Sequence, residues 1–130
     1  MKNKGFTLIE LLAVIVILAI IALIATPTIL GVVENARKGA AESSVLGYVD
    51  AIEKQAMINE MDSDATNDFA NTEYTIEDLD AKKVSVKGQK PSLSGTNKVT
   101  ITNGEVQDTT FTVGKYTVTY TQSTGKAVAQ

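Results

Sequence analysis

The chain has 130 residues with no cysteine and no histidine, and its 12 basic and 15 acidic residues give a formal net charge of −3. The missing cysteines exclude disulfides, thiolate metal sites and a cysteine nucleophile, and the missing histidines exclude the commonest zinc ligand and the usual general base. A chain of this length has room for one small domain, and its acidic balance does not suit a general nucleic-acid binder.

The N-terminal stretch begins with two lysines and continues into a long apolar run. Lys2 and Lys4 precede the run without an accompanying acid, a pattern that keeps this end of a membrane segment in the cytoplasm. As a helix, residues 6–25 would reach about 30 Å, the thickness of the hydrocarbon core of a bilayer. Residues 11–25 contain no polar side chain, and one acid, Glu10, stands just before them.

Glu10 is the most costly residue of this apolar segment. An acidic charge costs about 2.5–3.5 kcal/mol at the centre of a membrane and less near the interface, so such a residue usually has a partner or a function. From the residues alone three interpretations stay open: a secretory signal peptide, a permanent single-span anchor, and a segment that packs in an assembly. The length of the run, the position of Glu10 and the lack of a clean A-x-A cleavage site argue against the signal peptide.

Residues 28–61 continue in a helical pattern that is no longer uniformly apolar. Apolar and small residues recur every three or four positions, which predicts an amphipathic helix whose apolar stripe is covered by a sheet. Two series follow this spacing: Val33, Ala36, Ala40, Ser44 and Gly47, and Val45, Val49, Ile52 and Ala56.

An acidic segment follows the predicted helix. Asp62, Asp64, Asn67 and Asp68 are turn formers whose side chains compete with helical hydrogen bonds, so they are expected to end the helix. The same four residues form a weak calcium candidate. They lack the glycine and the distal glutamate of an EF-hand loop, and a solvated acidic loop is therefore the preferred interpretation. No cofactor and no other metal site is predicted.

The rest of the chain predicts one short helix and then strands. Thr75 is expected to cap a helix that starts at Ile76, with Asp78 three residues after the cap. From residue 84 the pattern alternates, which predicts an antiparallel meander of three or four strands with outward-facing threonines, after a loop at Pro91. The alternating segments are 84–86, 99–101, 110–113 (the return strand after the first turn), 116–120 and 126–130, of which three or four are expected to form the meander, and the turns are 103–104, 114–115 and 123–125.

The segment KGFTLIELL at residues 4–12 resembles the class III signal of type IV pilins and pseudopilins, a resemblance that extends to Pro27 and covers about a fifth of the chain. In that family a membrane-embedded prepilin peptidase cuts after the glycine, and the new N-terminal phenylalanine is usually N-methylated. The resemblance implies cleavage between Gly5 and Phe6. This cut removes Lys2 and Lys4, leaves 125 of the 130 residues and changes the formal charge from −3 to −5.

The resemblance also implies a role for Glu10. In the family, the glutamate of one subunit is thought to meet the N-terminal amine of a neighbour, and a buried ion is tolerated chiefly when it is paired. Glu10 and Phe6 are therefore predicted assembly residues that set the axial register of a filament. The alternative is an interfacial glutamate whose carboxylate merely reaches out to water.

Pro27 matches the proline that interrupts the N-terminal helix in the family, because proline removes a helical hydrogen bond. Many relatives carry a helix-weakening glycine within the apolar segment, whereas Ala19 stands in the middle of this one. Alanine favours helix by about 1 kcal/mol over glycine. Any melted span in a filament is therefore expected near Pro27, around residues 25–26.

The predicted fold class is α+β, a long N-terminal helix with an apolar first half and an amphipathic second half, packed on a small antiparallel sheet of three or four strands. The predicted organisation is a leader at 1–5, an apolar membrane and filament-core helix at 6–27, and a globular domain at 28–130, made of helix 28–61, a loop and short helix at 62–83 and the meander 84–130. Because it has no cysteine, the chain resembles the cysteine-free pilins that are common in Gram-positive relatives.

No nucleotide-binding, hydrolase or metalloprotease motif occurs, so an enzyme is not expected. Three functions stay open. The first is a type IV pilin, expected to be the major one, for adhesion, biofilm formation or surface motility. The second is a pseudopilin of a competence or type II secretion system, and the third is a membrane-anchored binding domain that never polymerises.

The resemblance further implies where the chain resides and what it meets. The precursor is expected in the cytoplasmic membrane with its N-terminus inside, and the mature subunit in a helical homo-oligomer at the cell surface. The expected partners are the prepilin peptidase and the assembly ATPase and platform machinery. Nucleic acid is not expected as a direct ligand.

Overall fold

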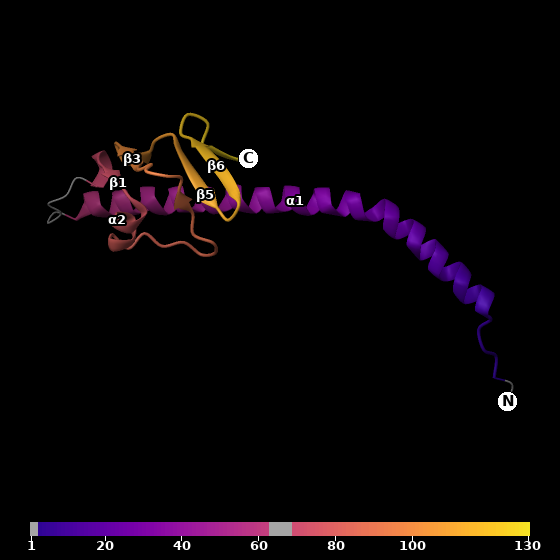
Figure 1. Cartoon of the computed structure of the whole chain (residues 1–130). Coiled ribbons are helices and arrows are strands. Elements are labelled where there is room, and N and C mark those ends of the chain that lie inside the picture. Colours follow the sequence, from indigo (N-terminus) through magenta and orange to yellow (C-terminus); the bar gives the residue numbers. More distant parts are fainter. Residues whose placement is uncertain (1–2, 63–68) are drawn as a thin grey trace. The chain divides into compact units, whose positions relative to one another are not determined.

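The structure, a computed structural model, describes residues 3–62 and 69–130. It divides into two compact units, Met1–Ala36 and Arg37–Gln130, each of which is described by itself. The long helix α1, Leu8–Met61, contributes to both units, and the strands of the described residues all lie in the second one (Figure 1). The α+β class is confirmed.

The first unit consists of the start of the chain and the apolar part of α1. None of its described residues, 3–36, is buried, and its large apolar side chains range in exposure from 93% for Phe6 to 40% for Val33. By length and composition, α1 contains a stretch long and apolar enough to cross a membrane. This unit is therefore a helix without a core of its own.

The second unit is built on the rest of α1. Its six fully covered helical residues are Ala41, Val45, Tyr48, Val49, Ile52 and Ala56, which pack in one cluster with the strands. Of the two predicted apolar series, the one from Val45 to Ala56 is thus buried. In the other series Val33, Ala36, Ala40 and Gly47 are exposed and Ser44 is half-buried.

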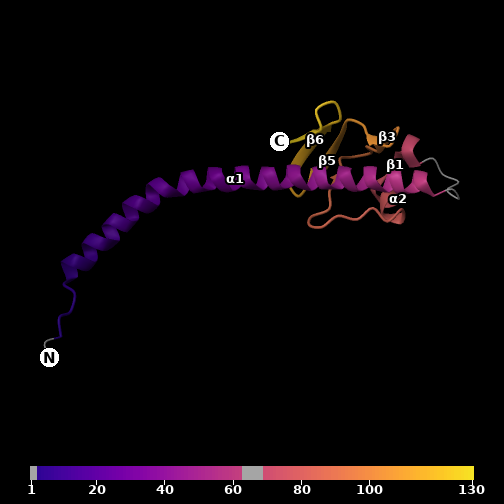
Figure 2. The same ribbon diagram turned by 180° about the vertical axis from the view of Figure 1, so that it is seen from behind.

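The strands form two antiparallel sheets. The three-stranded sheet has the order β1–β3–β4, with β1 Glu73–Tyr74, β3 Val99–Thr102 and β4 Glu105–Val106. The four-stranded sheet has the order β2–β5–β6–β7, with β2 Ser92–Leu93, β5 Thr109–Val113, β6 Tyr116–Thr121 and β7 Lys126–Ala129. The views in Figures 1 and 2 both show β5 and β6 lying against the second half of α1.

The predicted turns connect these strands. Asn103 and Gly104 have φ values of 53° and 80°, the positive values of a type I′ turn, and they join the paired residues Thr102 and Glu105. Strand β6 alternates as predicted, with Thr117 and Thr119 exposed between buried residues.

Three details of the predicted meander are wrong. Residues 84–86 form no strand, because the N–H of Val84 bonds the carbonyl of Leu79 and closes the end of the preceding helix. The return strand after Gly104 is β4, and the predicted return strand around Thr110 belongs to β5 in the other sheet. The segment after Pro91 is the short strand β2 rather than a loop.

Helix α2, Ile76–Ala81, begins with the predicted cap. The Thr75 hydroxyl accepts the N–H of Asp78, and the Asp78 carboxylate accepts the N–H of Thr75, so the two form a capping box. The hydrogen bonds from the side chain and backbone of Thr75 lower the pKa of Asp78 below its usual value. Lys90 forms an ion pair with Asp80.

The core of the second unit centres on two aromatic rings. Tyr48 of α1 and Phe111 of β5 are both fully buried, with ring centroids 6.0 Å apart in an edge-to-face arrangement. The Tyr48 hydroxyl has no hydrogen-bond partner among the described residues. Burial and, secondarily, the charge of Asp80 raise the pKa of Tyr48 to about 12.

Two glutamate side chains of α1 accept hydrogen bonds from backbone N–H groups of the strands. Glu53 Oε1 accepts the N–H of Val106 at 3.1 Å, and Glu42 Oε1 accepts the N–H of Ala129 at 2.9 Å. Both bonds are partly buried. They attach β4 and β7 to the helix in a chain without disulfides.

Candidate functional site

The predicted assembly residue Glu10 lies in the first turn of α1, where it caps its own helix. The N–H of Thr7 donates to Glu10 Oε2 at 2.8 Å, and the N–H of Glu10 donates to the Thr7 hydroxyl at 3.3 Å. The N–H of Leu11 donates to the Thr7 carbonyl at 3.2 Å. Thr7 and Glu10 therefore form a capping box, and the carboxylate also lies where the helix dipole favours a negative charge.

Thr7 is a site residue that the sequence interpretation missed. The signal was present, because Thr7 and Glu10 have the spacing T-x-x-E of a capping box immediately before an apolar run. The cost of an acid near a membrane predicted a partner for Glu10 in another chain, whereas within the chain its partner is Thr7, three residues upstream.

Gly5 and Phe6 precede the helix in an exposed segment. Gly5 does not have a positive φ, and an added Cβ at Gly5 would meet no atom within 4 Å. Neither the backbone conformation nor packing within the chain therefore requires glycine at this position. Any requirement for glycine at Gly5 must come from a molecule that acts on the chain.

The surroundings of Glu10 are apolar and open. Phe6, Glu10, Leu11 and Val14 together line a hollow of about 460 Å³ on the first unit. A second apolar hollow of about 360 Å³ lies further along the same helix, between Ile21 and Ile29. The acid thus stands at the start of a wholly apolar helical surface, where an added cation would be its natural partner.

Pro27 lies inside α1 and does not end it in the single chain. Proline removes the helical bond to the carbonyl of Leu23 and its ring crowds that carbonyl, but α1 continues on both sides of it. The neighbouring Thr26 hydroxyl bonds a different carbonyl, that of Ala22, at 2.6 Å. The helix therefore tolerates Pro27. The melted span around residues 25–26 concerns an assembled filament and stays a prediction.

The weak calcium candidate falls mostly outside the described residues. Asp64, Asn67 and Asp68 lie in the segment 63–68, and Asp62 is the exposed residue that follows the last turn of α1. The described residues contain no group of three or more acidic side chains placed to hold a metal ion.

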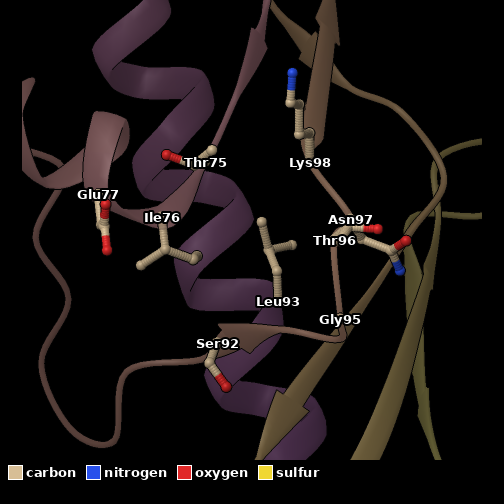
Figure 3. A pocket seen from close by; sticks show the side chains of 9 residues that line it. All are labelled: Thr75, Ile76, Glu77, Ser92, Leu93, Gly95, Thr96, Asn97 and Lys98. Atoms are coloured by element: carbon tan, nitrogen blue, oxygen red, sulfur yellow. The ribbon is translucent and has the colours of Figure 1, made fainter.

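A groove on the second unit lies between α2 and β2, where Ile76 and Leu93 form an apolar floor (Figure 3). Three of its polar side chains already have partners within the chain. Thr75 belongs to the capping box of α2, the Ser92 hydroxyl donates to the carbonyl of Thr112 at 3.2 Å, and Lys98 pairs with Glu73 at 3.9 Å. These three side chains hold the two sheets and α2, and the other polar side chains of the lining, Glu77, Thr96 and Asn97, are exposed.

Comparison with protein families matches residues 1–26 to a model described as the prokaryotic N-terminal methylation motif. This motif is the class III prepilin signal of type IV pilins and pseudopilins, so the resemblance stated from residues 4–12 is confirmed. The match ends within the first unit and does not extend to the strands. Neither the comparison with curated proteins nor the comparison with solved structures gave a significant match.

Proposed function

We propose that this chain is a pilin-type subunit that is cut between Gly5 and Phe6 and then polymerises through α1 into a type IV pilus filament. One observation carries the proposal: the methylation motif at residues 1–26 ends in the N-terminal part of α1, where the large apolar side chains are all exposed. Such a surface needs a bilayer or other helices to cover it, and a subunit that leaves the membrane for a filament exchanges one cover for the other.

Glu10 would guide that exchange through the new N-terminal amine of Phe6. Capping uses Glu10 Oε2, and a carboxylate has about four acceptor positions, so the same group can also accept from the amine of a neighbouring copy. In an apolar surround, the Glu10 carboxylate and the amine each offset the cost of burying the other. Incoming subunits would therefore add in one axial register.

The finer proposal is that this chain is a major pilin that serves adhesion, biofilm formation or surface motility. Its partners are then the prepilin peptidase, the assembly ATPase and platform, and further copies of itself. The precursor resides in the cytoplasmic membrane and the mature chain in a surface filament. The pseudopilin of a competence or secretion system and the non-polymerising anchor are competing outcomes of the same tests.

The first test is intact mass and N-terminal sequencing of protein sheared from the cell surface. A chain that starts at methylated Phe6 and is abundant in long fibres is expected for a major pilin. The same start found only in the membrane fraction would point to a pseudopilin or a minor subunit. A start at Met1, or beyond Ala25, would overturn the pilin-type function.

The second test separates the two roles of Glu10. Glutamine can replace glutamate in a capping box, so Glu10→Gln keeps the helix cap and removes the charge, whereas Thr7→Ala removes the cap and keeps the charge. Glu10→Gln is expected to abolish filaments and Thr7→Ala to reduce them several-fold at most. Glu60→Gln, the same change at an exposed position of α1, is the control. Filaments from the Glu10→Gln variant would contradict the pairing of charges.

A further inference from the structure

The turn between β3 and β4 contains Asn103–Gly104, the dipeptide that is most prone to spontaneous deamidation. In this reaction the backbone nitrogen of the residue after asparagine loses its proton and attacks the side-chain carbon Cγ. A C–N bond forms and closes a succinimide ring, the Cγ–Nδ2 bond breaks, and ammonia leaves. Water then opens the ring to give aspartate or isoaspartate. Glycine as the second residue favours the attack, because it has no side chain that obstructs ring closure.

Asn103 satisfies the sequence requirement for this reaction, and no other asparagine in the chain does. It alone precedes a glycine, whereas every other asparagine precedes a residue with a side chain. Asn103 is also exposed, so water can reach its side-chain amide. The local sequence therefore predicts fast deamidation at Asn103, unless the fold prevents the attack.

The fold holds the attacking nitrogen in place. Gly104 is a buried residue, and its N–H donates to the carbonyl of Ala70 at 3.1 Å. Ala70 is fully buried and lies in the short 3-10 helix η1, Phe69–Asn71. A buried, hydrogen-bonded amide loses its proton only when the structure around it opens. The nucleophile of the reaction is therefore unavailable while η1 is bound to the turn.

A second hydrogen bond holds the asparagine itself. The N–H of Asn103 donates to the side-chain Oδ1 of Asn71 at 2.9 Å, and Asn103 has a φ of 53°, in the left-handed region. Helix η1 is in turn anchored in the core, because Phe69 is buried and stacks on Tyr74 with ring centroids 4.8 Å apart. Both residues of the dipeptide are thus held by one element that is itself firmly packed.

We infer that Asn103 is a deamidation site whose rate is set by the opening of η1 from the β3–β4 turn. The modification alters the hairpin, because aspartate adds a negative charge close to Glu105 and isoaspartate lengthens the backbone of a two-residue turn by a carbon atom. The longer turn no longer fits the pairing of Thr102 with Glu105. The inference concerns the Arg37–Gln130 unit alone and goes beyond the proposed function.

The test follows two reactions that need the same opening, in the full chain in micelles of a neutral detergent at mildly alkaline pH. Peptide mass spectrometry measures the conversion of the Asn103 amide to an acid, and NMR measures hydrogen exchange at the Gly104 N–H. In the folded chain, deamidation is expected to be at least about tenfold slower than in unfolding concentrations of urea, because only the open fraction reacts. Equal rates in the two conditions would overturn the inference.

Variants of Asn71 test the gate directly. Asn71→Ala removes the acceptor of the Asn103 N–H at an exposed position and so spares the core. It is expected to raise the deamidation rate at Asn103 and the exchange rate at Gly104 by the same factor, about fivefold for one lost hydrogen bond. Asn71→Asp keeps an acceptor oxygen and is expected to keep both rates near those of the parent chain. Asn97→Ala, the same change at an exposed asparagine outside the turn, is the control and is expected to have no effect.

Three further results would overturn the inference. Faster exchange at Gly104 without faster deamidation would show that another step limits the reaction. An equal effect of Asn97→Ala would show that the bond to Asn71 has no specific role. An equal rise in exchange at the Val49 amide, in the buried part of α1, would show that Asn71→Ala weakens the whole unit. These measurements require neither cleavage nor assembly, so they are independent of whether the chain forms filaments in cells.

Discussion

The two units of this chain use apolar residues in opposite ways. In residues 3–36 the large apolar side chains of α1 are exposed and none of the described residues is buried, whereas in Arg37–Gln130 the same helix covers Val45, Tyr48 and Ile52 with strands. The second unit completes its own core. The first leaves its apolar surface for other molecules to cover, so its apolar sequence encodes an environment and not a tertiary fold.

The largest expected effect is a loss of folding stability in the core of the second unit. Phe111→Ala removes a fully buried ring that contacts Tyr48 and is expected to destabilise this unit by about 3–5 kcal/mol. Chemical unfolding followed by circular dichroism measures the loss. Val128→Ala, at a strand position 54% exposed, is the matched control and should cost under about 0.5 kcal/mol. Equal losses for the two variants would refute the assigned core.

In the first unit, an added charge is expected to reduce membrane insertion, because this unit has no packed core to disrupt. Ile17→Lys places a cation in the middle of the apolar stretch and is expected to disfavour membrane insertion by about 2.5–3.5 kcal/mol. The fraction of protein in the membrane pellet measures this effect. The unfolding midpoint of the second unit is expected to stay unchanged, and a lower midpoint would show that the apolar stretch supports the core.

The buried Tyr48 predicts a loss of stability in alkali. Its pKa is raised to about 12 in the folded state from about 10 in the unfolded chain, so the unfolded state releases the proton first. The contribution of the protonated Tyr48 to the free energy of unfolding is fully present below pH 10 and is lost as the pH rises to about 12. The loss is about 2–3 kcal/mol at most.

Tyr48→Phe supplies the comparison for this pH dependence. It removes the titrating group and an unpaired buried hydroxyl, so this variant is expected to be at least as stable as the parent at pH 7 and less sensitive between pH 10 and 12. Urea midpoints at a series of pH values measure the difference. Because burial also raises the pKa of Tyr120, some alkaline dependence should remain.

The smallest expected effect is the loss of a helix cap, which can be compared between the two capping boxes, one in each unit. Thr7→Ala and Thr75→Ala each remove a cap worth about 1 kcal/mol, so amide exchange in the first turn of each helix should rise about fivefold. Thr→Ser at either position should restore protection. Only Thr7→Ala is expected to reduce filament yield, and an equal reduction by Thr75→Ala would show that general stability sets the yield.

Local patterns predicted much of the fold. Asn103–Gly104, the alternation from Tyr116 and the Thr75 cap were all identified from residue type and spacing, because each depends on neighbours in sequence. The segment 84–86 failed for the same reason: two valines alternate, but Val84 ends a helix through a bond to Leu79 that no strand pattern reveals. The division into two sheets depends on long-range pairing and could not be read locally.

In the candidate site, too, features that depend on neighbours in sequence were predicted and features that depend on the fold were not. The motif around Gly5 and Phe6 was identified because a peptidase signal is a local sequence, and the cost of Glu10 drew attention to its charge. The groove between α2 and β2 was not predicted, since it joins residues 75–77 to residues 92–98. No spacing rule connects them before the fold is known.

The two backbone attachments at Glu42 and Glu53 have a mechanical consequence. Strand β7 lies at the edge of its sheet, and a pull on the C-terminus would load its hydrogen bonds one after another, as in a zipper. The two backbone bonds between Gln130 and Thr117 are loaded first, and the bond from Ala129 to Glu42 is loaded next. A pull at this end would therefore release β7 from the unit in short steps before the core around Tyr48 and Phe111 is reached.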